Sequence, residues 1–175
     1  MSTQKLIIAG FGGQGVLLIG QMIAYAGMLE GKEVTWMPAY GPEMRGGTAN
    51  CTVIVSDKKI SSPITTEATA VIAMNLPSMK KFEGYVIPDG KLFVNTSLIK
   101  ERPDRADVEV FDVDANEIAV SLENDKISNM VVLGAIIKKT DIVKLESIEM
   151  VMEKMFTGKK EKLIPLNKKA LTAWQ

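Results

Sequence analysis

The opening of the chain sets the strongest limit on its fold. Residues 5–9 (KLIIA) are a short apolar run that stops at glycines, which is typical of a buried parallel strand. From Gly15 to Glu30 apolar residues recur at helical spacing, and Gly31 is a plausible end for this helix. Residues 34–37 (VTWM) follow as a second strand, so the start of the chain predicts a strand–helix–strand unit.

The same alternation continues along the rest of the chain. Strands are predicted over residues 51–55, 70–74, 91–95 and 108–111, and helices over residues 114–122, 129–139 and 146–156, with a short helix starting near residue 75 and a turn at residues 88–90. This order predicts an α/β fold, with a mostly parallel sheet, helices on both faces and a Rossmann-like three-layer sandwich. We expect one domain over residues 1–175, with a core of about residues 5–156 and a basic C-terminal extension over residues 157–175.

The composition excludes several classes of function. The 175 residues carry 21 Lys plus Arg and 21 Asp plus Glu, and this balance gives no electrostatic case for binding nucleic acid or a membrane surface. There is no histidine and only one cysteine, Cys51, so this chain alone supplies neither an imidazole base nor the four thiolates of an iron–sulfur cluster. The longest apolar run, residues 130–137, is too short to span a bilayer, and the first residues lack a signal-peptide pattern. We therefore expect a cytoplasmic protein.

Charge is unevenly distributed along the chain. Nine acids stand against two arginines between Glu101 and Asp125, whereas five lysines stand against one glutamate between Gly158 and Lys169. Such runs are usually solvated surfaces. The alternative is a docking surface for a complementary subunit or an anionic cofactor.

Residues 10–15 (GFGGQG) match the G-x-G-x-x-G pattern, follow a strand and open a helix. Glycines let a backbone approach a ligand closely, and a helix N-terminus offers N–H groups to an anion. A dinucleotide-binding fold usually has an acid at the end of the next strand, where this chain has residues 37–40 (MPAY). Glu33 lies at the wrong end of that strand, which disfavours direct NAD or FAD binding. The candidate residues of this loop are Gly10, Gly12, Gly13, Gln14 and Gly15.

A second glycine-rich loop spans residues 40–48 and follows the second strand. In a parallel sheet it lies at the same carboxyl edge as the first loop, which is where open α/β sheets bind ligands. Glu43 and Arg45 would form a charge pair shielded by whatever packs on top, and the alternative is an exposed loop with a weak ion pair. The candidate residues of this loop are Tyr40, Gly41, Pro42, Glu43, Arg45, Gly46 and Gly47.

A third segment, residues 128–135 (SNMVVLGA), begins a predicted helix that Ser128 or Asn129 could cap. Gly134 and Ala135 make this helix thin enough for close packing. It is either simply a buried helix against the sheet or a helix whose Asn129 end lies beside the other two loops.

These three segments resemble the gamma subunits of 2-oxoacid:ferredoxin (acceptor) oxidoreductases. In that family a G-x-G-G-Q-G loop is followed by a Y-G-P-E-x-R-G-G loop and later by an N-x-x-x-L-G-A helix, here residues 10–15, 40–47 and 129–135. The resemblance covers roughly residues 5–156. It implies an accessory subunit, inactive by itself, of an enzyme that converts a 2-oxoacid and coenzyme A to acyl-CoA, carbon dioxide and reduced ferredoxin.

The resemblance also implies where the cofactors lie. Thiamine diphosphate, Mg²⁺ and iron–sulfur clusters belong to other subunits, with coenzyme A as co-substrate, and this chain alone binds no cofactor or metal. The implied partners are alpha and beta subunits, a ferredoxin-like delta subunit, and ferredoxin through the complex. The loops are implied to pack near the alpha–beta active site and to shape the approach of coenzyme A, with contacts expected at Gln14, Glu43, Arg45 and Asn129.

The second loop carries the only indication of substrate. Its residues 43–47 (EMRGG) resemble the form found in 2-oxoglutarate or branched-chain 2-oxoacid enzymes more than the pyruvate form, and 2-oxoglutarate is preferred. Two other classes of function stay open: a stand-alone nucleotide-binding Rossmann-like module, and a scaffold that only holds other subunits together. An isolated subunit would also expose the apolar face that its partners cover, which would favour a homodimer.

Overall fold

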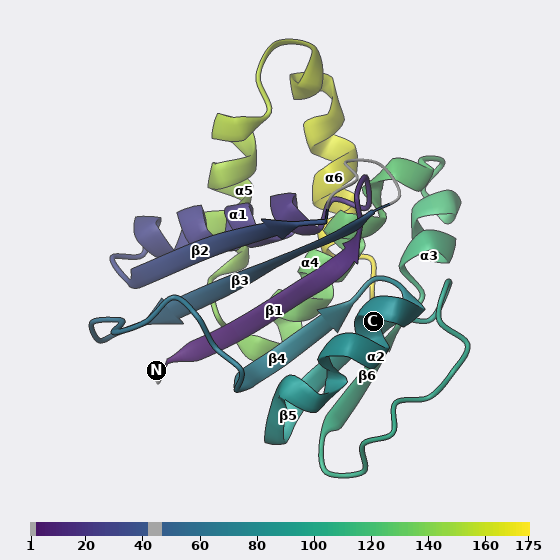
Figure 1. Ribbon diagram of the computed structural model, residues 1–175. Helices are drawn as coiled ribbons and strands as arrows, with labels where there is room; N and C mark the ends of the chain where they lie inside the picture. Colours follow the sequence, from purple (N-terminus) through teal and green to yellow (C-terminus); the bar gives the residue numbers. More distant parts are fainter. Residues whose placement is uncertain (1–2, 42–46) are drawn as a thin grey trace.

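The computed structural model describes residues 3–41 and 47–175. Within these residues six strands form one sheet, in the order β2-β3-β1-β4-β5-β6, with helices on both faces (Figure 1). The strands are β1 (Gln4–Phe11), β2 (Glu33–Tyr40), β3 (Thr48–Ser56), β4 (Ala68–Ala73), β5 (Val86–Asn95) and β6 (Glu109–Val113). The predicted α/β three-layer fold is confirmed.

The sheet is mixed rather than uniformly parallel. β1, β4, β5 and β6 pair in parallel, whereas β3 is antiparallel to both of its neighbours, β1 and β2. β1 and β2 therefore run in the same direction without pairing, because β3 lies between them. The predicted strand–helix–strand unit is thus interrupted by a strand from later in the chain. The carboxyl ends of β1 and β2 still lie at one edge of the sheet.

The two faces of the sheet are covered unequally. One face packs against α1 (Val16–Leu29), α3 (Ala115–Ser121) and α4 (Ser128–Thr140), with α5 (Leu145–Met155) and α6 (Ile164–Leu171) alongside α1 and α4. The other face carries α2 (Leu76–Phe82) (Figure 1). Short 3-10 helices are η1 (Glu83–Tyr85), η2 (Asp125–Ile127) and η3 (Gly158–Leu163). Alternation along β1 directs Leu6 and Ile8 into the large core and Ile7 and Ala9 into the small one.

The large core extends past residue 156, where the sequence predicts that it ends. The segment predicted to be a basic C-terminal extension, residues 157–175, contributes to this core. Ala170 and Leu171 are buried in the large core, where α6 packs against α4. A Cβ on Gly134 would lie 2.0 Å from the carbonyl oxygen of Leu171. Gly134 therefore does permit close packing, but against the end of α6.

Two local predictions are wrong. Residues 88–90 lie inside β5 rather than in a turn before it, because the strand begins at Val86 and absorbs an irregularity at Asp89, whose φ is 62°. Neither Ser128 nor Asn129 caps α4, since both are already helical and η2 leads directly into the helix. The residue before α4, Ile127, makes no side-chain capping bond.

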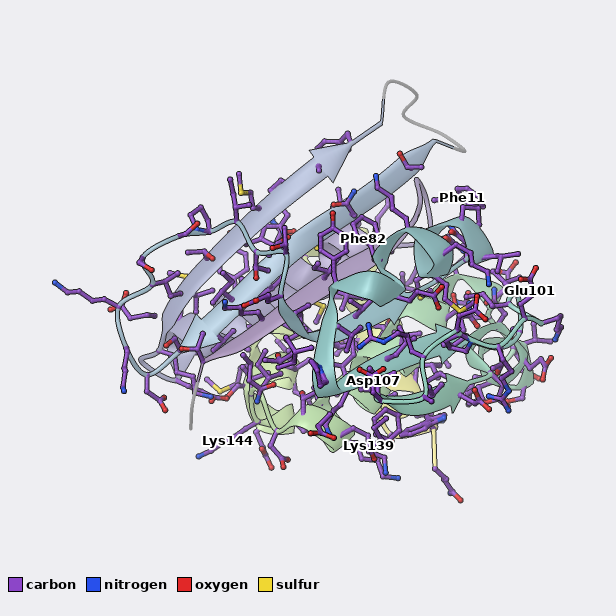
Figure 2. All side chains as sticks on the ribbon, turned by 60° about the horizontal axis from the view of Figure 1, so that its bottom comes forward. Phe11, Phe82, Glu101, Asp107, Lys139 and Lys144 are labelled. Carbon is purple, nitrogen blue, oxygen red and sulfur yellow. The ribbon has the colours of Figure 1, made fainter. Side chains whose placement is uncertain are left out.

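The acidic stretch between Glu101 and Asp125 lies largely at the surface, where Figure 2 shows Glu101 and Asp107. Its two arginines pair within it: Arg102 Nη1 lies 2.8 Å from Asp112 Oδ1, and Arg105 Nε lies 2.6 Å from Asp107 Oδ1. The Arg102 pair is exposed and contributes little to stability, whereas Arg105 is partly buried and also donates to the Glu83 and Val86 carbonyls. In the part of the chain that the structure describes, no helix is long and apolar enough to cross a membrane.

Candidate functional site

The first glycine loop joins β1 to α1 in a tight turn. Gly10 is still part of β1, and the turn requires positive φ at Gly13 (98°) and Gly15 (75°). A Cβ on Gly10 would approach Gln14 Oε1 to 2.6 Å and Met74 Cβ to 2.9 Å, so a larger residue there would push the loop off β4. These glycines are therefore needed for the backbone geometry of the turn.

The Gln14 side chain holds this loop against the neighbouring strand. Its Oε1 accepts hydrogen bonds from the Phe11 N–H (2.6 Å) and from Asn75 Nδ2 (3.2 Å), and its Nε2 donates to the Met74 carbonyl (3.3 Å). Three bonds from one amide leave little capacity for a ligand. The geometry thus favours a positioning role for Gln14.

The sequence reasoning missed the amides that continue this network. Asn75 caps α2 by accepting from the Ser78 N–H (2.9 Å), and Asn95 Nδ2 donates to Asn116 Oδ1 (2.9 Å) and to the Met74 carbonyl (3.4 Å). Asn75 follows β4 and Asn95 ends β5. A polar residue at or near the end of a buried strand was the signal that could have found them.

The second glycine loop meets the first, as their common edge predicts. The Gly12 N–H donates to the Gly47 carbonyl (2.8 Å), and the Gly41 N–H donates to the Thr48 carbonyl (2.7 Å). The stem of the second loop is therefore fixed on both sides. Pro42, Glu43, Arg45 and Gly46 lie outside the described residues, so their expected contacts stay predictions.

Asn129 belongs to the same edge. It is the second residue of α4, is 7% exposed, and packs on Gly15 so closely that a Cβ there would lie 2.4 Å from Asn129 Nδ2. The packing places this helix end against the first glycine loop, and its expected role at the site stays a prediction. The first glycine loop therefore contacts both the second loop and the start of α4.

A hollow of about 250 Å³ lies between the two loops, lined by the first glycine loop, the start of α1, Tyr40 and the start of β3. Two aromatic side chains flank it, Phe11 at 36% exposure and Tyr40 at 64% exposure. Figure 2 shows Phe11 at the surface, far across the molecule from Lys144. Among the described lining residues no carboxylate or amine is present, and the hollow offers backbone groups, two hydroxyl-bearing side chains (Tyr40 and Thr48) and aromatic surface.

The single thiol takes no part in this edge. Cys51 is fully buried in β3, and burial raises the pKa of its thiol to about 12. A thiol that keeps its proton is neither a nucleophile nor a metal ligand. In the described ranges, residues 3–41 and 47–175, no group of three His, Cys, Asp or Glu side chains is arranged to hold a metal ion.

Comparisons with known proteins identify the family and the fold. Residues 5–173 match the family described as pyruvate ferredoxin/flavodoxin oxidoreductase. The chain is 36% identical to the ketoisovalerate oxidoreductase subunit VorA of Methanothermobacter marburgensis over 97% of its own length and 35% of that protein. It is 28% identical to the 2-oxoglutarate synthase subunit KorC of Methanocaldococcus jannaschii, over 91% of its length and 87% of that protein.

A solved structure has the same fold at nearly the same length. The gamma subunit of a keto/oxoacid ferredoxin oxidoreductase from Geobacter sulfurreducens superposes with a TM-score of 0.82 at 26% identity, covering 97% of this chain and 95% of that one. By contrast, the chain spans only about a third of the length of VorA.

Proposed function

The chain belongs to the pyruvate ferredoxin/flavodoxin oxidoreductase family, and from this premise we propose that it is the gamma subunit of a multi-subunit 2-oxoacid:ferredoxin oxidoreductase. The complex would convert a 2-oxoacid and coenzyme A to acyl-CoA, carbon dioxide and reduced ferredoxin. The observation that carries the proposal is the meeting of the two glycine loops and Asn129 at one edge of the sheet. All three segments belong to the pattern by which the sequence resembles gamma subunits.

The chemistry of the reaction belongs to other subunits under this proposal. Thiamine diphosphate and Mg²⁺ would supply the decarboxylation, and iron–sulfur clusters would carry the electrons to ferredoxin. The residues of this chain do not fit an iron–sulfur cluster, because its one cysteine is buried and protonated. Among the described residues no group of three His, Cys, Asp or Glu side chains is arranged to hold a metal ion such as Mg²⁺. The chain alone is expected to be inactive.

The role of this chain would be to shape the surface that the other subunits and coenzyme A approach. Gln14 and Asn129 would act by holding the first glycine loop, as their packing indicates. Glu43 and Arg45 would supply the charged contacts, with the guanidinium of Arg45 suited to a phosphate or carboxylate.

An apolar surface supports assembly with other chains. Tyr25, Met28 and Leu29 lie on one face of α1 with 45–61% of each side chain exposed, beside Val151 and Met155 of α5. Residues of both helices line a hollow of about 510 Å³. Contiguous exposed apolar residues mark interaction surfaces. Alpha and beta subunits, or a second copy of the isolated chain, would cover this face.

For the substrate we propose 2-oxoglutarate, on the form of residues 43–47. The similarity to VorA favours a branched-chain 2-oxoacid as the second candidate. Purified complex should turn over one of these at least tenfold faster than pyruvate. A complex that prefers pyruvate would contradict the assignment.

The stand-alone nucleotide-binding module finds little support, since the described end of β2 carries no acid for a ribose. The scaffold alternative is separated by Arg45→Ala. Lost turnover in an intact complex would support a role at the active site, whereas dissociation of the complex would support scaffolding.

The deciding experiment is anaerobic affinity purification of the tagged chain from its native host. We expect co-purifying chains that carry thiamine diphosphate and iron–sulfur clusters, together with CoA-dependent reduction of a viologen dye by a 2-oxoacid. A chain that purifies alone, while the oxoacid activity stays in the lysate, would refute the proposal.

A further inference from the structure

A second hollow of about 490 Å³ borders the candidate site on the other side of the first turn of α1. Its floor is apolar, with Leu18 of α1, Met130 of α4 and Phe156 after α5, and its rim carries Lys126 and Lys160. We call it the lysine hollow. Asn129 lines it while packing on Gly15, so it is continuous with the edge where the glycine loops meet.

Asn129 is the first indication that something binds in the lysine hollow. Its side chain is 7% exposed, and no hydrogen bond joins its amide to any residue in the described parts of the chain. Its oxygen and nitrogen are not among the fully buried atoms without a partner in the described residues, so the amide reaches solvent at the hollow and is open to a ligand. A primary amide presents a carbonyl and N–H groups side by side, which complements the N–H and carbonyl of a peptide backbone.

Charge is the second indication. Lys126 and Lys160 are exposed, no acid lines the hollow, and neither lysine has an ion pair within the described residues. The neighbouring Lys168 differs, because Glu153 and Glu149 neutralise it at 2.8 and 3.3 Å. Within the described residues the rim therefore carries two lysines without ion pairs around a mostly apolar floor, which is the layout of a protein interface with a charged edge.

We propose that the lysine hollow binds an acidic segment of a partner subunit. One apolar side chain of that segment would enter between Leu18 and Phe156, its carboxylates would reach Lys126 and Lys160, and its backbone would pair with the Asn129 amide. The inference rests on the proposed function, because it takes the partner to be another subunit of the same oxidoreductase. The proposal gives a docking role to Lys160, which belongs to the basic stretch between Gly158 and Lys169.

The test uses the complex purified anaerobically, with association measured between the tagged chain and its cluster-bearing partners. The double variant Lys126→Glu/Lys160→Glu should weaken association at least tenfold and reduce its dependence on salt, because two attractive charges become repulsive. The matched control is Lys159→Glu/Lys162→Glu, which changes two exposed lysines of η3 outside the hollow and should change association less than threefold. Both double variants should unfold at the wild-type temperature, since all four side chains are exposed.

A photo-crosslinker at Leu163, which lines the hollow with 37% exposure, identifies the occupant directly. We expect a cross-link to a partner peptide that contains at least two Asp or Glu residues, and none from the same crosslinker at Val120 on α3.

Unchanged association of the Lys126→Glu/Lys160→Glu variant would overturn the proposal, as would a cross-linked peptide without acids. A variant that assembles normally but loses affinity for coenzyme A would overturn it in favour of a small anionic ligand. If wild-type chain binds no thiamine- or cluster-bearing subunit, the proposed function fails instead.

Discussion

Gly134→Ala tests the contact that adds the C-terminal helix to the core. The new Cβ would lie 2.0 Å from the Leu171 carbonyl oxygen and 2.7 Å from its carbonyl carbon, so the end of α6 must retreat by more than 1 Å. No rotamer change relieves a clash with backbone, so the cost falls in the upper range for overpacking, about 2–3 kcal/mol. Alanine stabilises a helix by about 1 kcal/mol relative to glycine, which offsets part of this cost. The net loss of stability is about 1–2 kcal/mol.

Urea and thermal unfolding followed by circular dichroism measure this loss. For a chain of this length each kcal/mol lowers the melting temperature by about 2–4 °C, so the expected decrease is about 2–8 °C. The matched control is Gly84→Ala in η1, where a Cβ meets nothing within 4 Å and φ is not positive. If Gly134→Ala unfolds together with wild type and Gly84→Ala, the inferred packing of α6 on α4 is refuted.

Three further predictions concern single side chains. Gln14→Ala removes three hydrogen bonds and should lower the free energy of unfolding by about 1–2 kcal/mol in urea titrations. The half-buried Gln21 makes no side-chain hydrogen bond within the described residues, so Gln21→Ala should have a smaller effect. Burial alone would raise the pKa of Glu30, but its hydrogen bonds with Lys32, the Lys144 N–H and Ser147 outweigh burial and lower that pKa. The stabilisation from ionised Glu30 is therefore present above the ordinary glutamate pKa of about 4.3 and is lost as the pH falls through the lowered pKa. The difference in melting temperature between wild type and Glu30→Gln should accordingly shrink toward pH 3. A constant difference would contradict this. Cys51, whose pKa burial raises to about 12, should resist iodoacetamide at pH 8.5 in the native protein and react fully in urea, and rapid native labelling would show the thiol to be accessible.

The parts of the fold that the sequence predicts are those set by local periodicity. β1 and β4 coincide closely with the apolar runs at residues 5–9 and 70–74, and α1, α4 and α5 begin and end within about a residue of their predicted ends. The strand order was not predictable in the same way. The run at residues 51–55 reads as a strand wherever it pairs, and only long-range packing determines that β3 enters between β1 and β2.

The C-terminal helix shows how charge can hide an apolar pattern. Lys168 and Lys169 make this stretch polar in composition, although Ile164 and Leu171 lie seven residues apart, which is the spacing of one helix face. At the candidate site, the glycine pattern predicted the turn and the meeting of the loops. The partners of Gln14 stayed hidden because Asn75 lies 61 residues away in the chain.

The unequal covering of the sheet has a consequence for how the glycine loop moves. α2 and the small core form the thinner layer, so this layer should open by local unfolding while α4 and the large core stay closed. Asn75 caps α2 and also bonds Gln14, so each opening of α2 removes one of the bonds that order the loop. Amide hydrogen exchange in residues 12–15 should therefore follow the exchange of α2 rather than that of α1, although the loop is covalently continuous with α1.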